Sequence, residues 1–206
     1  FAGDVLQNFV DEHDILREVI GSDNRPIPQI LGQHVNPGHT LEDAWFLLNS
    51  AESLQKPQWA QQIYAIVQKT LEIGWDREFG GLLHYCGIHG GKPEGEENGV
   101  EEEPMLAQMK DGWGDKLWWV HSEALYTTLR CYLETGDQSF WRWHQKIFEY
   151  TFRHFPNPDR EVREWVQILK RDGSPQDKVV ALPVKDPYHI TRNLLLILEL
   201  LYQQPE

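Results

Sequence analysis

The sequence predicts an all-α fold that is built from repeated helix pairs, with small β-hairpins between the pairs. The first observation is that apolar side chains recur at helical spacing along most of the 206 residues. The second is a repeated order of helix, helix and hairpin, which occurs twice with a period of about 75 residues and begins a third time near Tyr188. Each helix pair in such a repeat buries its apolar face against its neighbours.

The first three helices are predicted in the N-terminal part of the sequence. A helix over residues 4–20 carries apolar residues at helical spacing, and a loop that contains glycine and proline ends it. The next helix is expected from Thr40 to about Gln55, because Thr40-Leu41-Glu42-Asp43 is typical of a capping box. Pro57 opens the third helix, which runs to about Ile73.

Two segments without helical spacing follow. A hairpin is predicted over residues 75–93, where pairs of glycines enclose a short run of aromatic and apolar residues. The acidic residues between 94 and 103 are expected in a solvated loop, because closely spaced like charges repel one another. Helical spacing resumes only at about Asp115.

The second half repeats the pattern. Helices are predicted over residues 115–134 and 138–155, and a second hairpin follows with Asp172 and Gly173 at its turn. The last helix is expected from Tyr188 to about Gln203, and its nearly continuous run of leucines predicts deep burial.

Net charge and cysteine content exclude several classes of function. A formal net charge of −13 argues against a nucleic-acid partner, whose phosphates require clustered Lys and Arg. Cys86 and Cys131 are too few for a disulfide framework and have no zinc-binding spacing, which favours a reducing cytoplasm and predicts no metal site. The sequence has no basic, apolar leader and no apolar run of about 18 residues, so we expect neither secretion nor a membrane partner.

Histidines lie near the start of the first helix in each copy of the repeat: His39, His121 and His189. If equivalent helices run parallel around a common axis, their N-terminal ends meet on one face. Charged residues of the same helix starts would join them there: Glu42, Glu123 and Arg192. The positive end of a helix dipole favours the neutral, proton-accepting imidazole. The sequence therefore predicts a mouth lined by groups suited to proton transfer.

The tryptophan pair at positions 118 and 119 supplies a wall for this mouth. Trp119 lies four residues before Glu123, so the two side chains share one face of a helix. Trp118 is turned about 100° away from it. We therefore expect Trp119 to face the cavity and Trp118 to pack in the core.

Five motifs carry a resemblance to a known family when they are taken in their order along the chain: "NPGHTLEDAWFLL", "GWDREFGGLLHY", "KLWWVHSEALY", "EWVQILKRDG" and "PYHITRNLLLILELL". The sequence resembles the N-acylglucosamine 2-epimerase family, which also includes cellobiose 2-epimerases and aldose-ketose isomerases. The resemblance implies an (α/α)6 barrel, a toroid of six helical hairpins. It covers only the C-terminal half of a family member, so residues 1–206 are expected to form about half of the barrel as one domain.

The resemblance also implies roles for individual residues. His39 and His189 match the two histidines that act as general acid and base. Glu42 matches the carboxylate that supports the first histidine and contacts the substrate. Substrate binding, or the orientation of side chains at the mouth, is expected from a second group of residues: Trp119, His121, Glu123 and Arg192.

The activity that the resemblance implies is interconversion of N-acylglucosamine and N-acylmannosamine by proton transfer at C2. The "NPGH" and "WWVHSE" segments look closer to the N-acylglucosamine epimerases than to the cellobiose enzymes. Two alternatives on the same fold are an aldose-ketose isomerase of the mannose type and a cellobiose 2-epimerase, and a non-catalytic carbohydrate-binding fragment is an alternative of another class. The chemistry requires no metal or redox cofactor, and a nucleotide activator, which some relatives use, stays an open alternative.

We also expect this chain to need a further part for function. Its first helix resembles an outer helix without its inner mate, and its last resembles an inner helix without its outer mate. Both would expose apolar faces, which a soluble monomer rarely tolerates over large contiguous areas. The expectation is a missing N-terminal half, a partner chain or self-association as a homodimer, besides a small-molecule sugar substrate.

Overall fold

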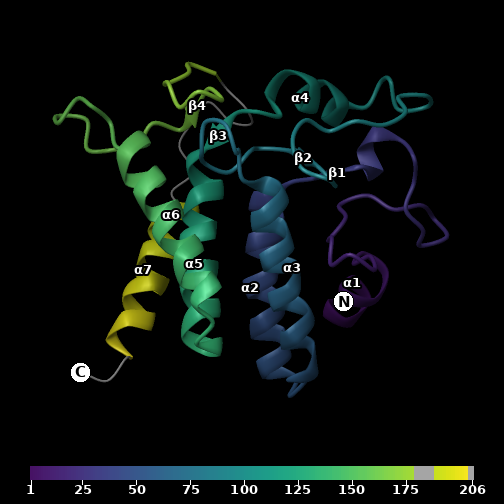
Figure 1. Ribbon diagram of the computed structural model, residues 1–206, viewed down its shortest axis with the longest axis horizontal. Coiled ribbons are helices and arrows are strands. Elements are labelled where there is room, and N and C mark those ends of the chain that lie inside the picture. Colours follow the sequence, from purple (N-terminus) through teal and green to yellow (C-terminus); the bar gives the residue numbers. More distant parts are fainter. Residues whose placement is uncertain (179–187, 204–206) are drawn as a thin grey trace.

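Paired helices that run side by side form the body of the structure (Figure 1). The computed structural model describes residues 1–178 and 188–203. The helices of the body are α2 (Pro37–Ser53), α3 (Gln58–Gly74), α5 (Trp118–Thr135), α6 (Gln138–His154) and α7 (Tyr188–Tyr202). Helix α5 packs against α2, α6 and α7, while α3 packs against α2. Helices α2, α5 and α7 start at the same end of the molecule, close to the small strands (Figure 1).

Short strand pairs connect the two ends of each helical hairpin. Strand β1 (His34–Val35) pairs with β2 (Cys86–Gly87), and β3 (Lys116–Leu117) pairs with β4 (Ile168–Leu169), both antiparallel. In each case the segment before the inner helix is bound to the segment after its outer mate. The strand pairs therefore fix where α2 and α5 begin.

The predicted hairpins are partly corrected by this pairing. The Asp172-Gly173 turn is confirmed, with Gly173 at φ +86° and a bridge between Leu169 and Pro175. In the first segment only Trp75 and Leu82 form a local bridge, because Cys86 and Gly87 pair with β1 instead. A pairing partner so far away in sequence leaves no local signal.

The predicted N-terminal helix over residues 4–20 is wrong. Helix α1 spans only Ala2–Asn8, and Val10 and Leu16 then face each other across an antiparallel bridge. The turn between them is stabilised by Asp11, whose Oδ1 accepts hydrogen bonds from the amides of His13 (2.9 Å) and Ile15 (3.1 Å). A local side-chain bond of this kind competes with helical hydrogen bonding.

Helix α2 begins earlier than the predicted capping box. Its N-cap is Asn36, whose Oδ1 accepts from the amides of Gly38 (3.0 Å) and His39 (3.2 Å). Pro37 occupies the first helical position, where a missing N–H costs nothing. His39 consequently lies in the first turn of α2, with its side chain near the helix end.

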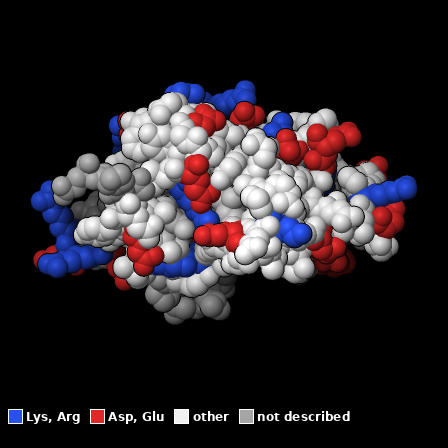
Figure 2. All heavy atoms as spheres, turned by 90° about the horizontal axis from the view of Figure 1, so that it is seen from below, with Lys and Arg blue, Asp and Glu red and all other residues white. Residues whose placement is uncertain are grey.

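Other differences concern shorter elements. The sequence prediction missed α4 (Pro104–Gly112), although a proline at its first position was a signal for it, and it missed the 3-10 helix η1 (Ile30–Gly32). The acidic segment before α4 is largely exposed, as expected for a solvated loop. Figure 2 shows acidic and basic side chains scattered over the face formed by the far ends of the helices.

The leucines of α7 were predicted to be deeply buried, and this prediction is wrong. Leu195, Leu198 and Leu201 remain about half exposed, at 56, 49 and 52 %. The helix packs against α5 through another side, where Asn193 is fully buried and donates to the Ser122 hydroxyl (3.1 Å). The expectation that the last helix presents an uncovered apolar face is confirmed for its described residues. No helix in the described part of the chain is long and apolar enough to cross a membrane.

A buried ion-pair cluster ties the two helical hairpins together. Lys116 of β3 is fully buried, and its Nζ lies 2.8 Å from Asp76 Oδ2. Arg171, next to the β4 turn, donates to both oxygens of the same carboxylate (2.9 and 3.1 Å). Asp76 follows α3, so one carboxylate joins three segments at the end where the inner helices begin.

Candidate active site

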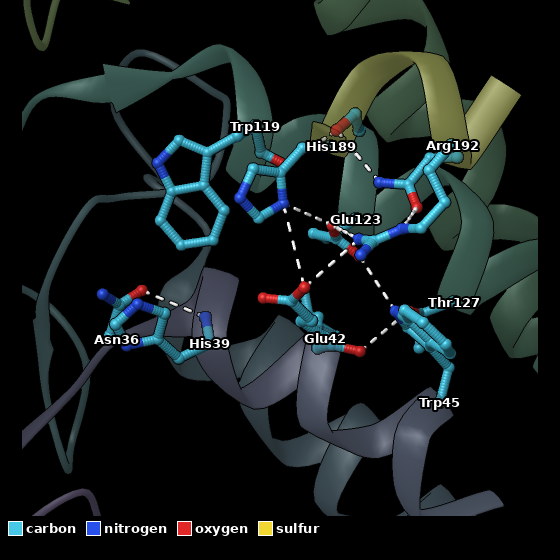
Figure 3. A network of polar contacts seen from close by, with 12 residues as sticks. Asn36, His39, Glu42, Trp45, Trp119, Glu123, Thr127, His189 and Arg192 are labelled. Carbon is cyan, nitrogen blue, oxygen red and sulfur yellow. Dashed lines mark hydrogen bonds and ion pairs between the residues drawn. The ribbon is translucent and has the colours of Figure 1, made fainter. Parts of the chain in front are cut away.

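Side chains from the starts of three inner helices converge on one site (Figure 3). Helix α2 contributes His39 and Glu42, α5 contributes Trp119 and Glu123, and α7 contributes His189 and Arg192. The structure thus brings together the predicted site residues except His121. Parallel helices with a common starting end place these side chains within reach of one another.

Glu123 lies at the centre of the polar network. Its side chain is fully buried, and its Oε1 accepts hydrogen bonds from His189 Nδ1 (2.7 Å) and Arg192 Nη2. Its Oε2 accepts from Trp45 Nε1 at 2.9 Å. A buried carboxylate is stable only when it is paired and hydrogen-bonded in this way. No local pattern indicates the Trp45 bond, because tertiary packing alone determines the partner of an indole N–H.

Arg192 is held between two carboxylates and two aromatic rings. Its Nη2 lies 3.2 Å from Glu42 Oε1, and its guanidinium carbon lies 3.8 Å from the ring centre of Tyr188 and 4.8 Å from that of Trp45. Burial raises the pKa of Glu42, and the charge of Glu123 raises it further, while His189 and Arg192 act in the opposite direction. Arg192 therefore balances the negative charge of the site.

Glu42 faces α7 and is not the carboxylate bonded to His39. Its Oε1 lies 3.9 Å from His189 Nδ1, on the side of Arg192. The partner of His39 is Glu18, whose Oε1 accepts from His39 Nδ1. Glu18 belongs to the loop after α1, in the segment that was predicted to be a helix. Because Glu18 and not Glu42 is bonded to His39, the prediction that Glu42 supports His39 is wrong.

The Glu18 contact also reverses the predicted protonation bias of His39. Burial lowers the pKa of this imidazole, but the hydrogen bond from its ring and the charge of Glu18 outweigh burial and raise the pKa above the usual value. A helix start alone would favour the neutral ring. His39 therefore holds its proton to higher pH than an isolated histidine would.

Trp119 lies against both imidazoles of the site. Its ring centre is 5.4 Å from that of His39 and 5.0 Å from that of His189 (Figure 3). Trp118 is buried in the core, so the predicted orientation of the pair is confirmed. A Cβ on Gly38 would come within 2.5 Å of the Trp119 ring, which explains why a glycine precedes His39 in "NPGH".

Comparison with known proteins identifies the family. Residues 1–192 match the N-acylglucosamine 2-epimerase (GlcNAc 2-epimerase) family. The chain belongs to this family. The N-acylglucosamine 2-epimerase of Mus musculus is 33% identical over 201 residues, which make up 96% of this chain and 43% of that protein. The cellobiose 2-epimerase of Eubacterium cellulosolvens is 25% identical over 164 residues, 79% of this chain and 35% of that protein.

Solved structures agree on the fold. The cellobiose 2-epimerase from Bacillus thermoamylovorans superposes with a TM-score of 0.73 at 18% identity, over 96% of this chain and 45% of that chain. A D-mannose isomerase superposes with a TM-score of 0.62 at 19% identity, over 81% and 37% of the two chains. The fold is therefore that of part of an (α/α)6 barrel, as the resemblance implied. The chain spans less than half the length of the relatives it matches.

In this member of the epimerase family, one group of described residues has the ligand types of a metal site. One ligand atom each from Glu42, Glu123 and His189 can be chosen so that all three lie within 4.8 Å of one another. Arg192 lies against both carboxylates at the same place. The guanidinium therefore supplies positive charge where a cation would otherwise bind.

His121 does not line the site, and this part of the prediction is wrong. The side chain is fully buried, its Nε2 accepts from the amide of Leu82 (3.0 Å), and its Nδ1 donates to the carbonyl of Leu117 (2.8 Å). Its ring stacks on Tyr150 with centres 5.2 Å apart. Both nitrogens are used for backbone contacts, so in this family member His121 has a structural role between the hairpins.

The burial of His121 predicts a loss of stability in mild acid. Burial lowers its pKa to about 3, whereas the unfolded value is 6.5. The neutral ring therefore stabilises the fold fully above pH 6.5, and this contribution falls as the pH drops toward 3, by about 1.4 kcal/mol per pH unit. Replacing His121 with glutamine should lower the free energy of unfolding at pH 7.5 and flatten its decline between pH 6.5 and 5.

Urea unfolding at several pH values measures this effect in the full chain. The exposed His13 provides the matched control, because His13→Gln should leave the pH dependence as it is in the parent. A His121→Gln variant whose stability declines with acid as steeply as that of the parent would contradict the assignment.

Proposed function

We propose that the full protein is a sugar 2-epimerase that interconverts N-acylglucosamine and N-acylmannosamine. The observation that carries the proposal is a pair of imidazoles, His39 and His189, that share one indole wall and are each bonded through Nδ1 to a carboxylate. Membership of the family supports it. The N-acyl substrate class is favoured because relatives named N-acylglucosamine 2-epimerase reach 34% identity over 96% of the chain, against 25% over 79% for a cellobiose 2-epimerase.

The proposed chemistry is inversion at the carbon next to a carbonyl. After the sugar ring opens, one imidazole removes the C2 proton. The electron pair of the broken C–H bond forms a C1=C2 double bond while the π electrons of the carbonyl move to O1, which gives an enolate. The other imidazole returns a proton to the opposite face of C2, which restores the aldehyde with inverted configuration. Two groups with pKa values near neutrality are suited to exchange the roles of base and acid.

The carboxylates and the indole have supporting roles in this proposal. Glu18 and Glu123 accept from Nδ1 of the two rings, so the Nε2 atoms are the ones that would handle the C2 proton. Trp119 offers an apolar face for the sugar ring. Arg192 pairs with Glu123 and holds this carboxylate in position. No metal or redox cofactor takes part, because both transfers are made by side chains. A nucleotide activator would act outside these steps.

Product analysis tests the proposal directly. The full protein is incubated in deuterated water with N-acetylglucosamine, glucose, mannose and cellobiose in turn, and the products are followed by NMR. We expect N-acetylmannosamine that carries deuterium at C2. A ketose product would show that the proton returns to C1, as in an aldose-ketose isomerase, and an epimerised disaccharide would point to the cellobiose activity. Sugar binding without turnover would overturn the proposal in favour of a carbohydrate-binding protein.

The cellular setting is also proposed. We place the protein in the cytoplasm, because its two cysteines are buried as free thiols among the described residues. Association with a further segment or a second copy is proposed from the exposed leucines of α7.

A further inference from the structure

The carboxylate that binds His39 also binds a second histidine. Glu18 directs Oε1 to His39 Nδ1 and Oε2 to His34 Nε2, the latter at 2.8 Å. The ring of His34 is fully buried, and its Nδ1 lies 2.7 Å from the carbonyl oxygen of Leu31. The side chain of His39, in contrast, is 53 % exposed at the open end of α2. A chain of hydrogen bonds thus runs from the interior to the site.

The hydrogen-bond acceptors around His34 determine in which direction these hydrogen bonds are donated. A backbone carbonyl only accepts, and an ionised carboxylate also only accepts. Both ring nitrogens of His34 face such groups, so the ring can take part in each of the two contacts only as a donor. Burial raises the pKa of Glu18, but hydrogen bonds from the two histidines outweigh burial and lower it to about 2. Glu18 therefore stays ionised in the range where an epimerase would work.

The backbone around Glu18 and His34 is fixed on both sides. Arg17 donates to Asp11 Oδ2 at 2.7 Å and to the carbonyl of Gly32 at 2.6 Å, which anchors the loop that presents Glu18. His34 is in β1, where it pairs with Gly87 of β2. The carboxylate therefore has little freedom to leave His39.

We infer that Glu18 and His34 form a positioning relay for His39: His34 fixes the Glu18 carboxylate, and Glu18 holds the imidazole of His39 with Nδ1–H turned inward and Nε2 directed to the substrate. The inference rests on the proposed function, in which His39 is one of the proton-transfer groups. In this inference Glu18, from a loop that precedes α2, orients His39 in the same way as Glu123 orients His189. Glu18 and His34 act through His39 and do not themselves touch the reacting carbon.

Other charges act on His39 besides Glu18. Asp43 and Glu42, from the same helix, both raise its pKa, and His84, from the loop before β2, lies close enough to be affected by its charge. None of these three is hydrogen-bonded to the His39 ring among the described residues. Asp43 and His84 are themselves affected by the charge of Glu18, so the change in the His39 titration on replacing Glu18 includes their response.

The first test measures His39 itself and does not depend on activity. The ring nitrogens of His39 are observed by long-range proton–nitrogen NMR in the full chain and assigned by comparison with His39→Gln. We expect the proton of the neutral ring on Nδ1, and in Glu18→Gln a titration midpoint lower by about one pH unit or more, because an opposite charge in contact is lost. Glu12→Gln, the same change at an exposed site of the same loop, should leave the midpoint in place.

The second test measures catalysis. Glu18→Gln should lower kcat about tenfold or more with little change in KM, and the limb of the pH profile that belongs to His39 should move to lower pH. His34→Leu removes both donors, whereas His34→Gln retains one donor for Glu18, so the glutamine variant should recover part of the lost kcat. A purely structural role of His34 would reduce the folded fraction without moving the pH profile.

The outcomes separate the inference from the proposed function. An unchanged His39 titration in Glu18→Gln overturns the relay, whether or not the protein epimerises sugars. A shifted titration in a protein without epimerase activity would show that Glu18 holds His39, but it would refute a role of this contact in catalysis. Equal losses of kcat in Glu18→Gln and Glu12→Gln would also contradict the inference.

Discussion

Replacing His189 with asparagine in the full chain is expected to lower epimerase turnover by about 10²-fold or more, and His39→Asn should do the same. Inversion beside a carbonyl needs one group to take the C2 proton and another to return one from the opposite face. Neither group can be replaced by the other, because each is held by its own carboxylate, Glu123 or Glu18. Sugar binding in the ground state should change much less than turnover.

Deuterium exchange at C2 distinguishes the two histidines. In deuterated water each single variant should still wash out the C2 proton of one epimer, through the imidazole that remains, while inversion is lost. The two variants should retain exchange from opposite epimers. His89→Asn serves as a control, because His89 is exposed in the loop after β2 and makes no contact with the site in the described structure. Near-normal inversion by either variant would show that the two-histidine assignment is wrong.

The helices of the body could be predicted from sequence because their signals are local. Apolar spacing identified α2, α3, α5, α6 and α7 to within a few residues. The same spacing placed Trp119 and Glu123 on one face of α5, and both side chains do point into the site. Since parallel inner helices start at one end of the molecule, this local information was enough to bring His39 and His189 together.

The partners of the two histidines could be predicted less well because they are not local. Glu18 lies 21 residues before His39 and reaches it only because Asp11 ends the helical path with a turn. A side chain that hydrogen-bonds to the backbone of a turn, as Asp11 does, outweighs a favourable apolar pattern over a few residues. The same limitation applies to His34, whose position depends on a strand pair with Gly87.

His121 failed as a prediction for a related reason. Its position near a helix start matches that of His39, but both of its nitrogens are bound to backbone groups, of Leu82 and Leu117. Both copies of the repeat have a histidine here, but the surroundings differ. The side chain of His39 is exposed to solvent, whereas that of His121 is covered by Tyr150. Periodicity predicts equivalent backbone positions and says little about which copy is accessible.

Replacing Glu123 with glutamine is expected to have the largest combined effect on stability and activity. The carboxylate is fully buried and accepts from three donors, on His189, Arg192 and Trp45. A neutral amide removes the negative charge that pairs with Arg192. Its N–H₂ group cannot accept a hydrogen bond, so at least one of the donors loses its acceptor. We expect the free energy of unfolding to fall by about 3 kcal/mol, the lower end for a broken buried ion pair, and turnover to fall by about 10²-fold or more.

Chemical unfolding and assays on the folded fraction separate the two effects. The matched control is Glu134→Gln, the same change on the same helix. Glu134 forms an ion pair with Arg130, and the Glu134 side chain is 35 % exposed, so the loss of free energy of unfolding should stay near 1 kcal/mol or below. A double variant, Glu123→Gln with Arg192→Met, should regain stability, because no guanidinium is left facing a neutral amide. It should remain inactive, since His189 still lacks the carboxylate at Nδ1. If the double variant recovered turnover, Glu123 would be needed only to neutralise Arg192, and its role in holding His189 would be refuted.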